Sequence, residues 1–315
     1  RPLLRANKDR KYKVHVVIFF IFLVANIGGS LTPLGDPPLF LGFLKGVDFF
    51  WTTKAMFIPM LFMVVSLLII FYIYDSIQYK KEGELPTATS REKIGLKGSF
   101  NLLLILGVVG SVLLSGFWKP HIEFTVYHVH VELQNIIRDI LLLCLAYASW
   151  KYTAKEIREA NEYTWFPIQE VAKLFAGIFI TIIPAIAILK AGTEGALAAI
   201  INSVSSDSGP VNHMYFWLTG ILSSFLDNAP TYLVFFNTAG GDAQVLMGEL
   251  SQTLLAISAG AVFMGANTYI GNAPNFMVKS IAESSGIEMP SFFGYFLYSL
   301  VILFPLFAIV SLLFF

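Results

Sequence analysis

Two short polar stretches, each inside a long apolar run, hold the residues of this sequence that could bind an ion. Residues 223–231 read SSFLDNAPT, and residues 265–275 read GANTYIGNAPN. Asp227 is the only acidic residue between Asp207 and Asp242. A carboxylate within a membrane segment is costly, so it is by default a functional candidate. With amide and hydroxyl oxygens it forms the kind of ligand set that hard cations such as sodium prefer.

The first stretch could bind and release a cation or a proton. Pro230 removes a backbone amide donor, and hydrocarbon offers no water to satisfy the carbonyls that a broken helix frees. Asp227, Asn228 and Thr231 would add further oxygens around those carbonyls. The alternative is that Asp227 only caps the following helix, with Asn228 and Thr231 satisfying its backbone. We favour the functional interpretation, because a cap outside the membrane would cost far less.

The second stretch has the composition of an unwound helix. Asn267, Thr268 and Asn272 are polar, Gly271 permits a tight backbone, and Pro274 suits the start of a new half-helix. The N-termini of half-helices attract anions, and their C-terminal carbonyls attract cations. The alternative is a structural kink in which the asparagines act as local caps.

A third stretch, residues 26–38, repeats the second. Its TPLGDPP lines up with TYIGNAP at an offset of 236 residues. The offset places Asp36 opposite Asn272, so the two copies differ by one potential charge. That asymmetry would suit one cation- or proton-binding half, with a turn-forming Asp before two prolines as the alternative. The candidate residues of this stretch are Asn26, Thr32, Gly35 and Asp36.

Membrane helices must position these stretches. Hydrophobic residues make up 56% of the chain and charged residues 13%, against about 25% charged residues in soluble domains. Much of the surface must therefore face lipid. Continuous apolar runs at residues 54–74, 99–117, 135–150, 168–189 and 291–315 approach or exceed the length of a bilayer span; the runs at 14–44, 212–237 and 245–281 are interrupted. We therefore predict an all-α polytopic membrane protein.

The charges of the loops indicate how the chain crosses the membrane. Loops rich in Lys and Arg favour the cytoplasmic side, and those at residues 1–13, 80–97 and 151–158 alternate with acidic loops. The loop TAGGDAQ lacks Lys and Arg, so residues 212–238 are predicted to form a re-entrant helical hairpin; one crossing by a broken helix is the alternative. With the hairpin, the two copies become inverted repeats with discontinuous transmembrane helices, a common plan of secondary transporters.

The predicted organisation is the C-terminal part of a first repeat at residues 1–75, with an unwound helix and one spanning helix, then a cytoplasmic linker at 76–98 and a second repeat at 99–315. The second repeat would contain three helices, the hairpin 212–238, an unwound helix at 245–284 and a last helix at 291–315. The offset places the counterpart of Asp227 before residue 1, so the first repeat would lack its own hairpin. We therefore expect the chain to be an N-terminally truncated transporter.

Other features argue against several classes of function. Lys plus Arg and Asp plus Glu both number 21, so no basic excess suggests a nucleic-acid partner. Cys144 is the single cysteine, which excludes an internal disulfide and a cysteine metal cluster. The phosphate-binding pattern GxxxxGK[ST] is absent, which argues against transport driven by ATP. No cofactor is expected, and sodium and protons are the predicted transported species.

The histidines gather in one loop, WKPHIEFTVYHVHVE. His128 and His130 at alternate positions could bind a metal if the chain is extended there. We expect instead an external amphipathic loop in which His121, His128 and His130 are solvated.

At LDNAPT and GANTYIGNAPN the sequence resembles the ion transporter superfamily, most of all the NhaD-type sodium/proton antiporters and their citrate- and arsenite-transporter-like relatives. The resemblance covers nearly the whole chain and implies a midplane site built from a hairpin tip and unwound helices. Dicarboxylate carriers of the superfamily use Ser-Asn-Thr at the hairpin tips, whereas LDNAPT favours a cation. The site residues that the resemblance implies are Asp227, Asn228, Pro230, Thr231, Asn267, Thr268, Gly271, Asn272, Pro274, Asn26, Gly28, Gly29, Thr32, Gly35, Asp36 and Pro37.

The predicted function is sodium/proton antiport with Asp227 as an alternating site for the cation and the proton. We expect Asp227, Asn228, Asn267 and Asn272 to hold sodium, and no enzymatic activity. Two alternatives stay open: an ion-coupled transporter of an organic anion or oxyanion, and a non-transporting membrane subunit. The expected partners are the lipid bilayer and small inorganic ions, with a homodimer left open and no nucleic acid. The expected location is the bacterial inner membrane.

Overall fold

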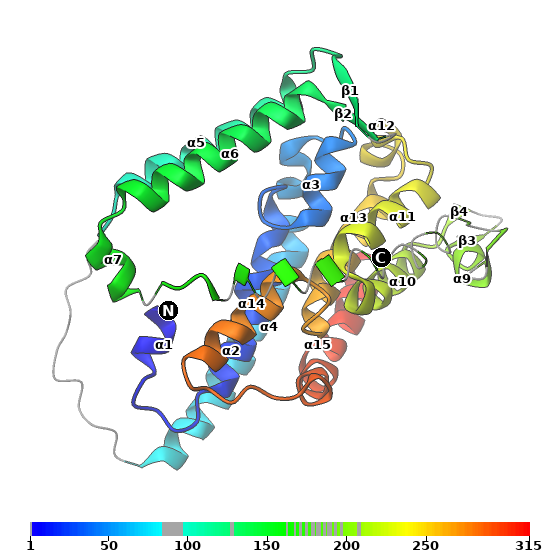
Figure 1. Ribbon diagram of the computed structural model, residues 1–315. Coiled ribbons are helices and arrows are strands. Elements are labelled where there is room, and N and C mark those ends of the chain that lie inside the picture. Colours follow the sequence, from blue (N-terminus) through cyan, green and yellow to red (C-terminus); the bar gives the residue numbers. More distant parts are fainter. Residues whose placement is uncertain are drawn as a thin grey trace. The chain divides into compact units, whose positions relative to one another are not determined.

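The computed structural model describes residues 2–83, 97–126, 129–161, 163–166, 168–169, 172–173, 176–177, 180, 184, 187, 191, 194–195, 198–206 and 209–315. These residues are mostly helical (Figure 1), which confirms the predicted all-α class. Four helical segments among them are long and apolar enough to cross a membrane: Val14–Leu31, Phe49–Glu82, Phe100–Phe117 and Phe292–Phe314. The prediction of a polytopic α-helical membrane protein is thus confirmed.

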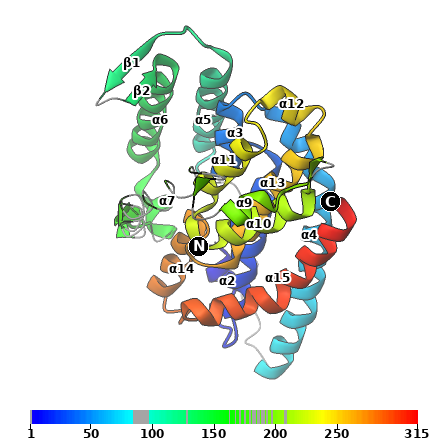
Figure 2. The ribbon, with the colours of Figure 1, turned by 90° about the vertical axis from the view of Figure 1, so that its right-hand side faces the viewer.

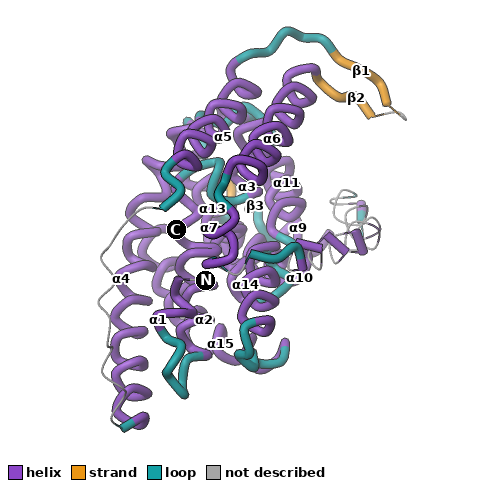
Figure 3. The backbone as a smooth tube through the Cα atoms, turned by 60° about the vertical axis from the view of Figure 1, so that its left-hand side comes forward, coloured by secondary structure: helices purple, strands orange, loops and turns teal. Residues whose placement is uncertain are grey.

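The smaller of two compact units, Arg1–Leu3 with Pro86–Thr164, is built on a pair of long helices. Helices α5 (Phe100–Phe117) and α6 (Leu133–Tyr152) pack along each other (Figure 3). The antiparallel strands β1 (Glu123–Val126) and β2 (Val129–Glu132) lie between them in sequence, and α7 (Lys155–Ala160) follows. Asn101 joins the helices at their other end, since its Nδ2 donates to Thr153 Oγ1 at 3.0 Å and its Oδ1 accepts from Ser149 Oγ at 2.7 Å.

Two of the predicted crossings have a different outcome from the rest. Residues 135–150 form most of α6, which is not among the four apolar helices because polar residues in its first turns, Arg138 and Asp139 among them, lower its hydropathy. The run predicted at residues 168–189 lies largely outside the described residues.

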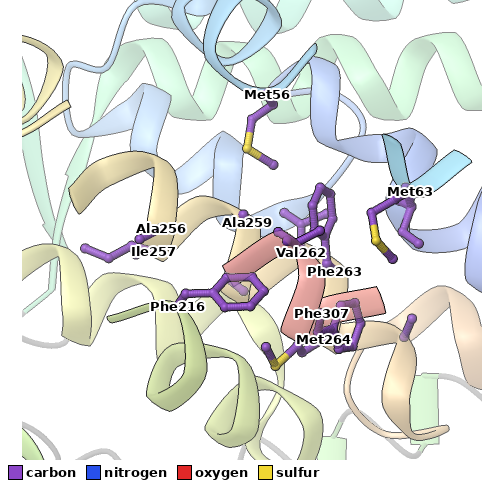
Figure 4. Close-up of a cluster of buried hydrophobic side chains, with 14 of the residues drawn as sticks. Met56, Met63, Phe216, Ala256, Ile257, Ala259, Val262, Phe263, Met264 and Phe307 are labelled. Atoms are coloured by element: carbon purple, nitrogen blue, oxygen red, sulfur yellow. The ribbon is translucent and has the colours of Figure 1, made fainter. Parts of the chain in front are cut away.

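The larger unit, Leu4–Leu85 with Trp165–Phe315, is organised around α13 (Ser251–Met264), in which residues 253–264 are all buried. Helices α3 (Pro37–Leu44), α4 (Phe49–Glu82), α10 (Asn212–Leu226) and α11 (Asn228–Thr238) all contact α13. Helix α10 packs tightly because Gly260 of α13 leaves room for the backbone carbonyl of Phe216. Figure 4 shows this apolar core, where the ring of Phe216 lies 6.3 Å from that of Phe307.

The outer elements of the larger unit complete the core. Helix α15 (Phe292–Phe314) contacts α4 and α10 (Figure 2). Helix α14 (Ala273–Ser284) contacts the N-terminal segment. The other described elements of the chain are short: α1 (Pro2–Ala6), α9 (Ala198–Asn202), β3 (Ser205–Ser206), β4 (Gly209–Pro210) and α12 (Ala243–Met247).

Three interruptions break the helices of the larger unit. The N-terminal segment passes from α2 (Val14–Phe20) to a π-helix, η1 (Ile21–Asn26), and then to a 3-10 helix, η2 (Ile27–Leu31). Helix α13 passes into a second 3-10 helix, η4 (Gly265–Asn267), before α14 begins. Asp227 alone separates α10 from α11, which contact each other. The predicted interruptions are present, while the re-entrant path of residues 212–238 through a membrane stays a prediction.

Helix α4 is longer than its apolar run predicts. It begins after Asp48, whose side chain accepts a hydrogen bond from the Phe50 amide at 2.9 Å, and it continues to Glu82. The first residues of the predicted linker 76–98 are therefore helical, and residues 84–96 lie outside the described part of the chain. The predicted repeat boundaries and the cytoplasmic side of the linker stay predictions.

Candidate functional site

The breaks in the third stretch (residues 26–38, the first break below) and in the second stretch (residues 265–275, the second break below) have the same local backbone. Each starts in a 3-10 helix and then becomes extended, at Thr32 (φ −143°, ψ 152°) and at Thr268 (φ −136°, ψ 167°). Each ends in an extended N-cap residue, Asp36 (φ −152°, ψ 138°) or Asn272 (φ −154°, ψ 139°), followed by a helix with proline in its first turn. The sequence repeat therefore extends to backbone conformation, while the inverted orientation of the copies stays a prediction.

Pairs of glycines let the backbone of each break approach itself. A Cβ atom on Gly29 would lie 2.6 Å from the carbonyl oxygen of Gly35, and one on Gly271 would lie 2.6 Å from that of Gly265. Since real Cβ atoms do not approach a backbone oxygen so closely, a larger residue at Gly29 or Gly271 would push the two sides of the break apart. At the offset of 236 residues, Gly29 and Gly35 are equivalent to Gly265 and Gly271, so the same close approach of the backbone occurs in both breaks.

Asp36 is the centre of the polar cluster that the breaks create. It caps the start of α3 by position and is 2% exposed, yet its side chain makes no capping bond. Instead its Oδ1 accepts hydrogen bonds from Asn228 Nδ2 at 2.9 Å and from Asn272 Nδ2 at 3.1 Å. Asn272 Nδ2 also lies 3.1 Å from Asn26 Oδ1. These four residues, Asp36, Asn26, Asn228 and Asn272, are called the Asp36 cluster below.

Asp227 forms the turn between α10 and α11 in a backbone conformation that few residues adopt. Its φ is 75°, a left-handed value that Asp and Asn tolerate better than other non-glycine residues. Its Oδ1 accepts the backbone amide of Asn228 at 2.7 Å, and its carbonyl accepts Thr231 Oγ1 at 2.8 Å. Asp227 therefore caps α11, as the alternative interpretation of the sequence expects.

Pro230 does not break a helix. It is the third residue of α11, where its missing amide would have no intrahelical partner. The interruption lies at Asp227 itself, three residues earlier than the proline. Pro274 lies at the second position of α14, as predicted for the start of a half-helix.

Asn228 connects the two carboxylates of the larger unit's breaks. Its backbone amide donates to Asp227 and its side-chain amide donates to Asp36. The sequence places these aspartates 191 residues apart (227 − 36), so their connection through one residue is a product of the fold. One asparagine thus lies between two buried carboxyl groups.

Several oxygens of this region lack a hydrogen-bond partner among the described residues. They are buried side-chain atoms, namely Asp36 Oδ2, Asn228 Oδ1, Asn267 Oδ1 and Asn272 Oδ1. A buried polar atom without a partner is unfavourable, so native proteins satisfy nearly all of them with protein, water or ions. Buried oxygen atoms of this kind are the ligand type that a hard cation prefers. The sodium ligation predicted for Asp227, Asn228, Asn267 and Asn272 stays a prediction.

The remaining predicted residues support the breaks in different ways. Thr268 Oγ1 donates to the carbonyl of Ser224 and accepts the Gly271 amide at 3.0 Å, and Asn267 Nδ2 donates to Ser224 Oγ at 2.9 Å. Thr32 contributes its carbonyl, which accepts the Gly35 amide at 2.9 Å. The Thr231 side chain donates to the carbonyl of Asp227, so it stabilises the turn.

Two polar residues of the breaks were not predicted as site residues. Ser224 receives both Asn267 and Thr268, and Asn275 Nδ2 donates to the carbonyls of Gly265 and Thr268, each at 2.8 Å. Both lie within the motifs that drew attention to the site, so their polarity inside an apolar run was the available signal.

The histidine loop gives no metal site in the described part of the chain. His130 Nδ1 lies 3.3 Å from Thr125 Oγ1 and 3.9 Å from Glu123 Oε2, and His121 has a positive φ of 57°. His128 lies outside the described residues. No group of three or more His, Cys, Asp or Glu side chains that could hold a metal ion occurs among the described residues.

A family model described as "Putative citrate transport" matches residues 1–315. No curated protein and no solved structure matches the chain.

Proposed function

The chain belongs to this citrate-transport family, and on that premise we propose that it carries citrate or a related organic anion across the membrane together with a cation bound at the Asp36 cluster. Membership makes it a transporter and not an enzyme. It also favours the organic-anion alternative of the sequence analysis over sodium/proton antiport. Residence in the bacterial inner membrane and assembly as a homodimer stay predictions.

The buried carboxylate of Asp36 is the observation that supports cation coupling. Its Oδ2 has no partner, and no Lys, Arg or His side chain pairs with it among the described residues. At 4 Å, two like charges repel by about 4 kcal/mol in surroundings of intermediate polarity. A citrate carboxylate would therefore approach this site only after a cation has neutralised Asp36.

The helix ends around the cluster support an organic anion as cargo. Helices α3, α11 and α14 begin directly after Asp36, Asp227 and Asn272. Asn228 and Asn272 link these three starts by hydrogen bonds. A helix N-terminus carries partial positive charge and unpaired amides, which favour carboxylate groups. A cation on the side-chain oxygens and an anion at the helix starts would complement each other.

Uptake of labelled citrate into proteoliposomes tests this proposal. An inward sodium gradient is expected to drive uptake by the wild type. The Asp36→Asn variant is expected to lose about tenfold to a hundredfold of that rate, which corresponds to one charged contact. Asp242→Asn is the matched control, because Asp242 also caps a helix but is exposed and lies at α12. The proposal would be refuted if uptake did not depend on any cation gradient, or if the Asp36→Asn variant took up citrate at the wild-type rate.

Sodium/proton exchange is a second candidate, favoured by the two carboxylates that Asn228 bridges. It predicts sodium-driven proton movement in vesicles that contain no organic anion. A pH-sensitive dye inside the vesicles measures this flux. Proton movement only in the presence of citrate would support the first proposal, and movement without citrate would support exchange.

A further inference from the structure

Asn26 and Asn275 form a bridge between the two related breaks. Asn26 Nδ2 donates to Asn275 Oδ1 at 2.6 Å, and both residues are fully buried. Asn26 ends the π-helix before the first break, and Asn275 lies in the first turn of α14 after the second. The bridge joins residues 249 positions apart in the chain. We propose that these two asparagines are positioning residues, which hold the first break against the second and so set the place of Asp36 relative to Asn272.

The orientation of both side chains follows from the carbonyls around them. Asn275 Nδ2 lies 2.8 Å from the backbone oxygens of Gly265 and Thr268, which can only accept. Its Oδ1 must therefore face Asn26. Asn26 Nδ2 also lies 2.8 Å from the carbonyl of Ile21, so its Oδ1 must face Asn272. The result is one directed chain of amides from Asn272 through Asn26 to Asn275.

Asn26 stabilises the π-helix as well as the bridge. In a π-turn the hydrogen bond joins a carbonyl to the amide five residues later, so the pattern of paired carbonyls is irregular. Such turns are frequent at functional sites. The carbonyl of Ile21, the first residue of η1, receives the Asn26 side chain. The start of the first break is thus anchored locally through Ile21 and across the fold through Asn275.

The use of side-chain oxygens separates positioning asparagines from ligand candidates. Asn228, Asn267 and Asn272 each keep a buried Oδ1 without a partner among the described residues. In Asn26 and Asn275 every side-chain nitrogen and oxygen is engaged. A cation would have to displace an existing hydrogen bond to bind Asn26 or Asn275. At the other three asparagines it would supply the partner that the side-chain oxygen lacks.

The bridge acts on Asp36 through Asn272. The side-chain amide of Asn272 contacts Asn26 Oδ1 and Asp36 Oδ1, both at 3.1 Å. Loss of Asn275 would release Asn26, and Asn26 would no longer present its oxygen to Asn272. Asn272 could then turn away from Asp36, which would disorder a cation site without removing any of its ligands.

Hydrogen–deuterium exchange on purified full-length protein tests the bridge without any assumption about cargo. Asn275→Ala is expected to increase exchange in peptides covering residues 21–36, although the substitution lies in α14. Asn275→Ser still donates one hydrogen bond, so it is expected to give a smaller increase in exchange. It also keeps the test decisive if Asn275→Ala does not fold. Asn101→Ala is the matched control, since Asn101 also bridges two helices but in the smaller unit. Unchanged exchange at 21–36 in both Asn275 variants would overturn the proposal.

Sodium dependence of citrate uptake tests the consequence for the site and rests on the proposed function. Asn26→Ala and Asn275→Ala are each expected to raise the half-saturating sodium concentration about tenfold, with the double variant close to either single one, because both remove the same bridge. Asn101→Ala is expected to lower thermal stability and leave half-saturation unchanged. The bridge would be refuted if each single variant changed the half-saturating sodium concentration only slightly and the double variant showed the product of the two changes. A wild type that takes up no citrate would refute the proposed cargo, and the exchange measurement would still decide the bridge.

Discussion

Asn272 donates its side-chain amide to Asp36 at 3.1 Å, and these two residues occupy equivalent positions in the two related breaks. Both are extended N-cap residues with nearly equal backbone angles. The repeat therefore brings its two equivalent residues into contact and gives only one of them a charge. A second carboxylate at residue 272 would face Asp36 directly, so the difference between the copies limits the junction to a single negative charge.

Exchange of the two side chains tests whether the charge at the junction or its position in one copy matters. Asp36→Asn alone is expected to abolish most sodium-dependent uptake. The double variant Asp36→Asn with Asn272→Asp restores one carboxylate and one amide at the same contact. We expect it to recover to within about tenfold of the wild-type rate, because the same carboxylate–amide contact is restored with its two members exchanged. Uptake in proteoliposomes measures the recovery.

Asn272→Asp alone serves as the control for this exchange. It places two carboxylates in contact. Because unpaired buried charges destabilise the folded protein, we expect a lowered yield of folded protein, with sodium bound by the fraction that folds. Failure of the double variant to exceed Asp36→Asn would show that the two copies are not interchangeable at this contact.

Substitutions at Asp227 separate its charge from its turn. Asn tolerates the positive φ and can still accept the Asn228 amide, so Asp227→Asn is expected to fold and to lose far less uptake than Asp36→Asn. Asp227→Ala loses the cap and is strained at this φ, so we expect it to be destabilised by about 1–3 kcal/mol. Thermal unfolding in detergent and uptake measure the two effects. The alternating-site role predicted for Asp227 requires the opposite order, with Asp227→Asn as the more damaging of the two Asn variants.

The interruptions and long helices could be predicted because their signals are local. Apolar length fixes a spanning helix such as α4 or α15, and the glycines and proline around Asn272 mark a break whatever surrounds it. The same local logic predicted the equivalent break at Asp36. Where apolar and charged residues are mixed, as in α6 with Arg138 and Asp139, the predicted crossing is not among the four apolar helical segments of the described residues.

The arrangement of the site could not be predicted because its bonds are long-range. Asp36 meets Asn228 over 192 residues and Asn272 over 236, and no local pattern encodes which carboxylate will be central. Because Asp227 is the isolated acid in the sequence, it was predicted as the central carboxylate. In the structure, the buried carboxylate oxygen without a partner among the described residues belongs to Asp36. Asn275 was equally invisible as a bridge, since its partner Asn26 lies near the other end of the chain.

The N-terminal segment of the larger unit is tied to the end of α4 by charged groups. Arg10 donates to Asp75 at 2.6 Å and lies 3.4 Å from Glu82, and His15 contacts the same Asp75 oxygen at 2.7 Å. The Arg10 side chain is only 10% exposed. Arg10→Ala is expected to lower the free energy of unfolding by about 1–3 kcal/mol, because it removes the guanidinium group that Asp75 and Glu82 share. Thermal unfolding in detergent measures this loss.

An exposed ion pair provides the comparison for Arg10. Lys155 and Glu159 lie 3.4 Å apart on α7, with side chains 77% and 64% exposed. Exposed pairs contribute little, so Lys155→Ala is expected to leave the unfolding temperature unchanged. Equal shifts for Arg10→Ala and Lys155→Ala would contradict a stabilising role for the partly buried network around Arg10.

Gly42 sets the distance between the helices that carry Asp36 and Asn228. It lies in α3, and a Cβ atom there would collide with the hydroxyl of Tyr232, a buried residue of α11. Gly42→Ala is therefore expected to push α3 away from α11, with a loss of about 1–3 kcal/mol in stability from overpacking. Because Asp36 starts α3 and Asn228 starts α11, the same shift is expected to lengthen their 2.9 Å contact and weaken sodium binding.

Tyr232→Phe removes the hydroxyl that the new methyl group would strike. We expect Gly42→Ala combined with Tyr232→Phe to regain part of the stability and sodium affinity that Gly42→Ala loses, as measured by thermal unfolding at increasing sodium concentrations. Gly110→Ala is the matched control, since a Cβ on Gly110 in the middle of α5 meets no atom within 4 Å. Alanine there is expected to be neutral or stabilising because it favours helix over glycine. If Tyr232→Phe brought no recovery, packing between α3 and α11 would not be what holds Asp36 beside Asn228.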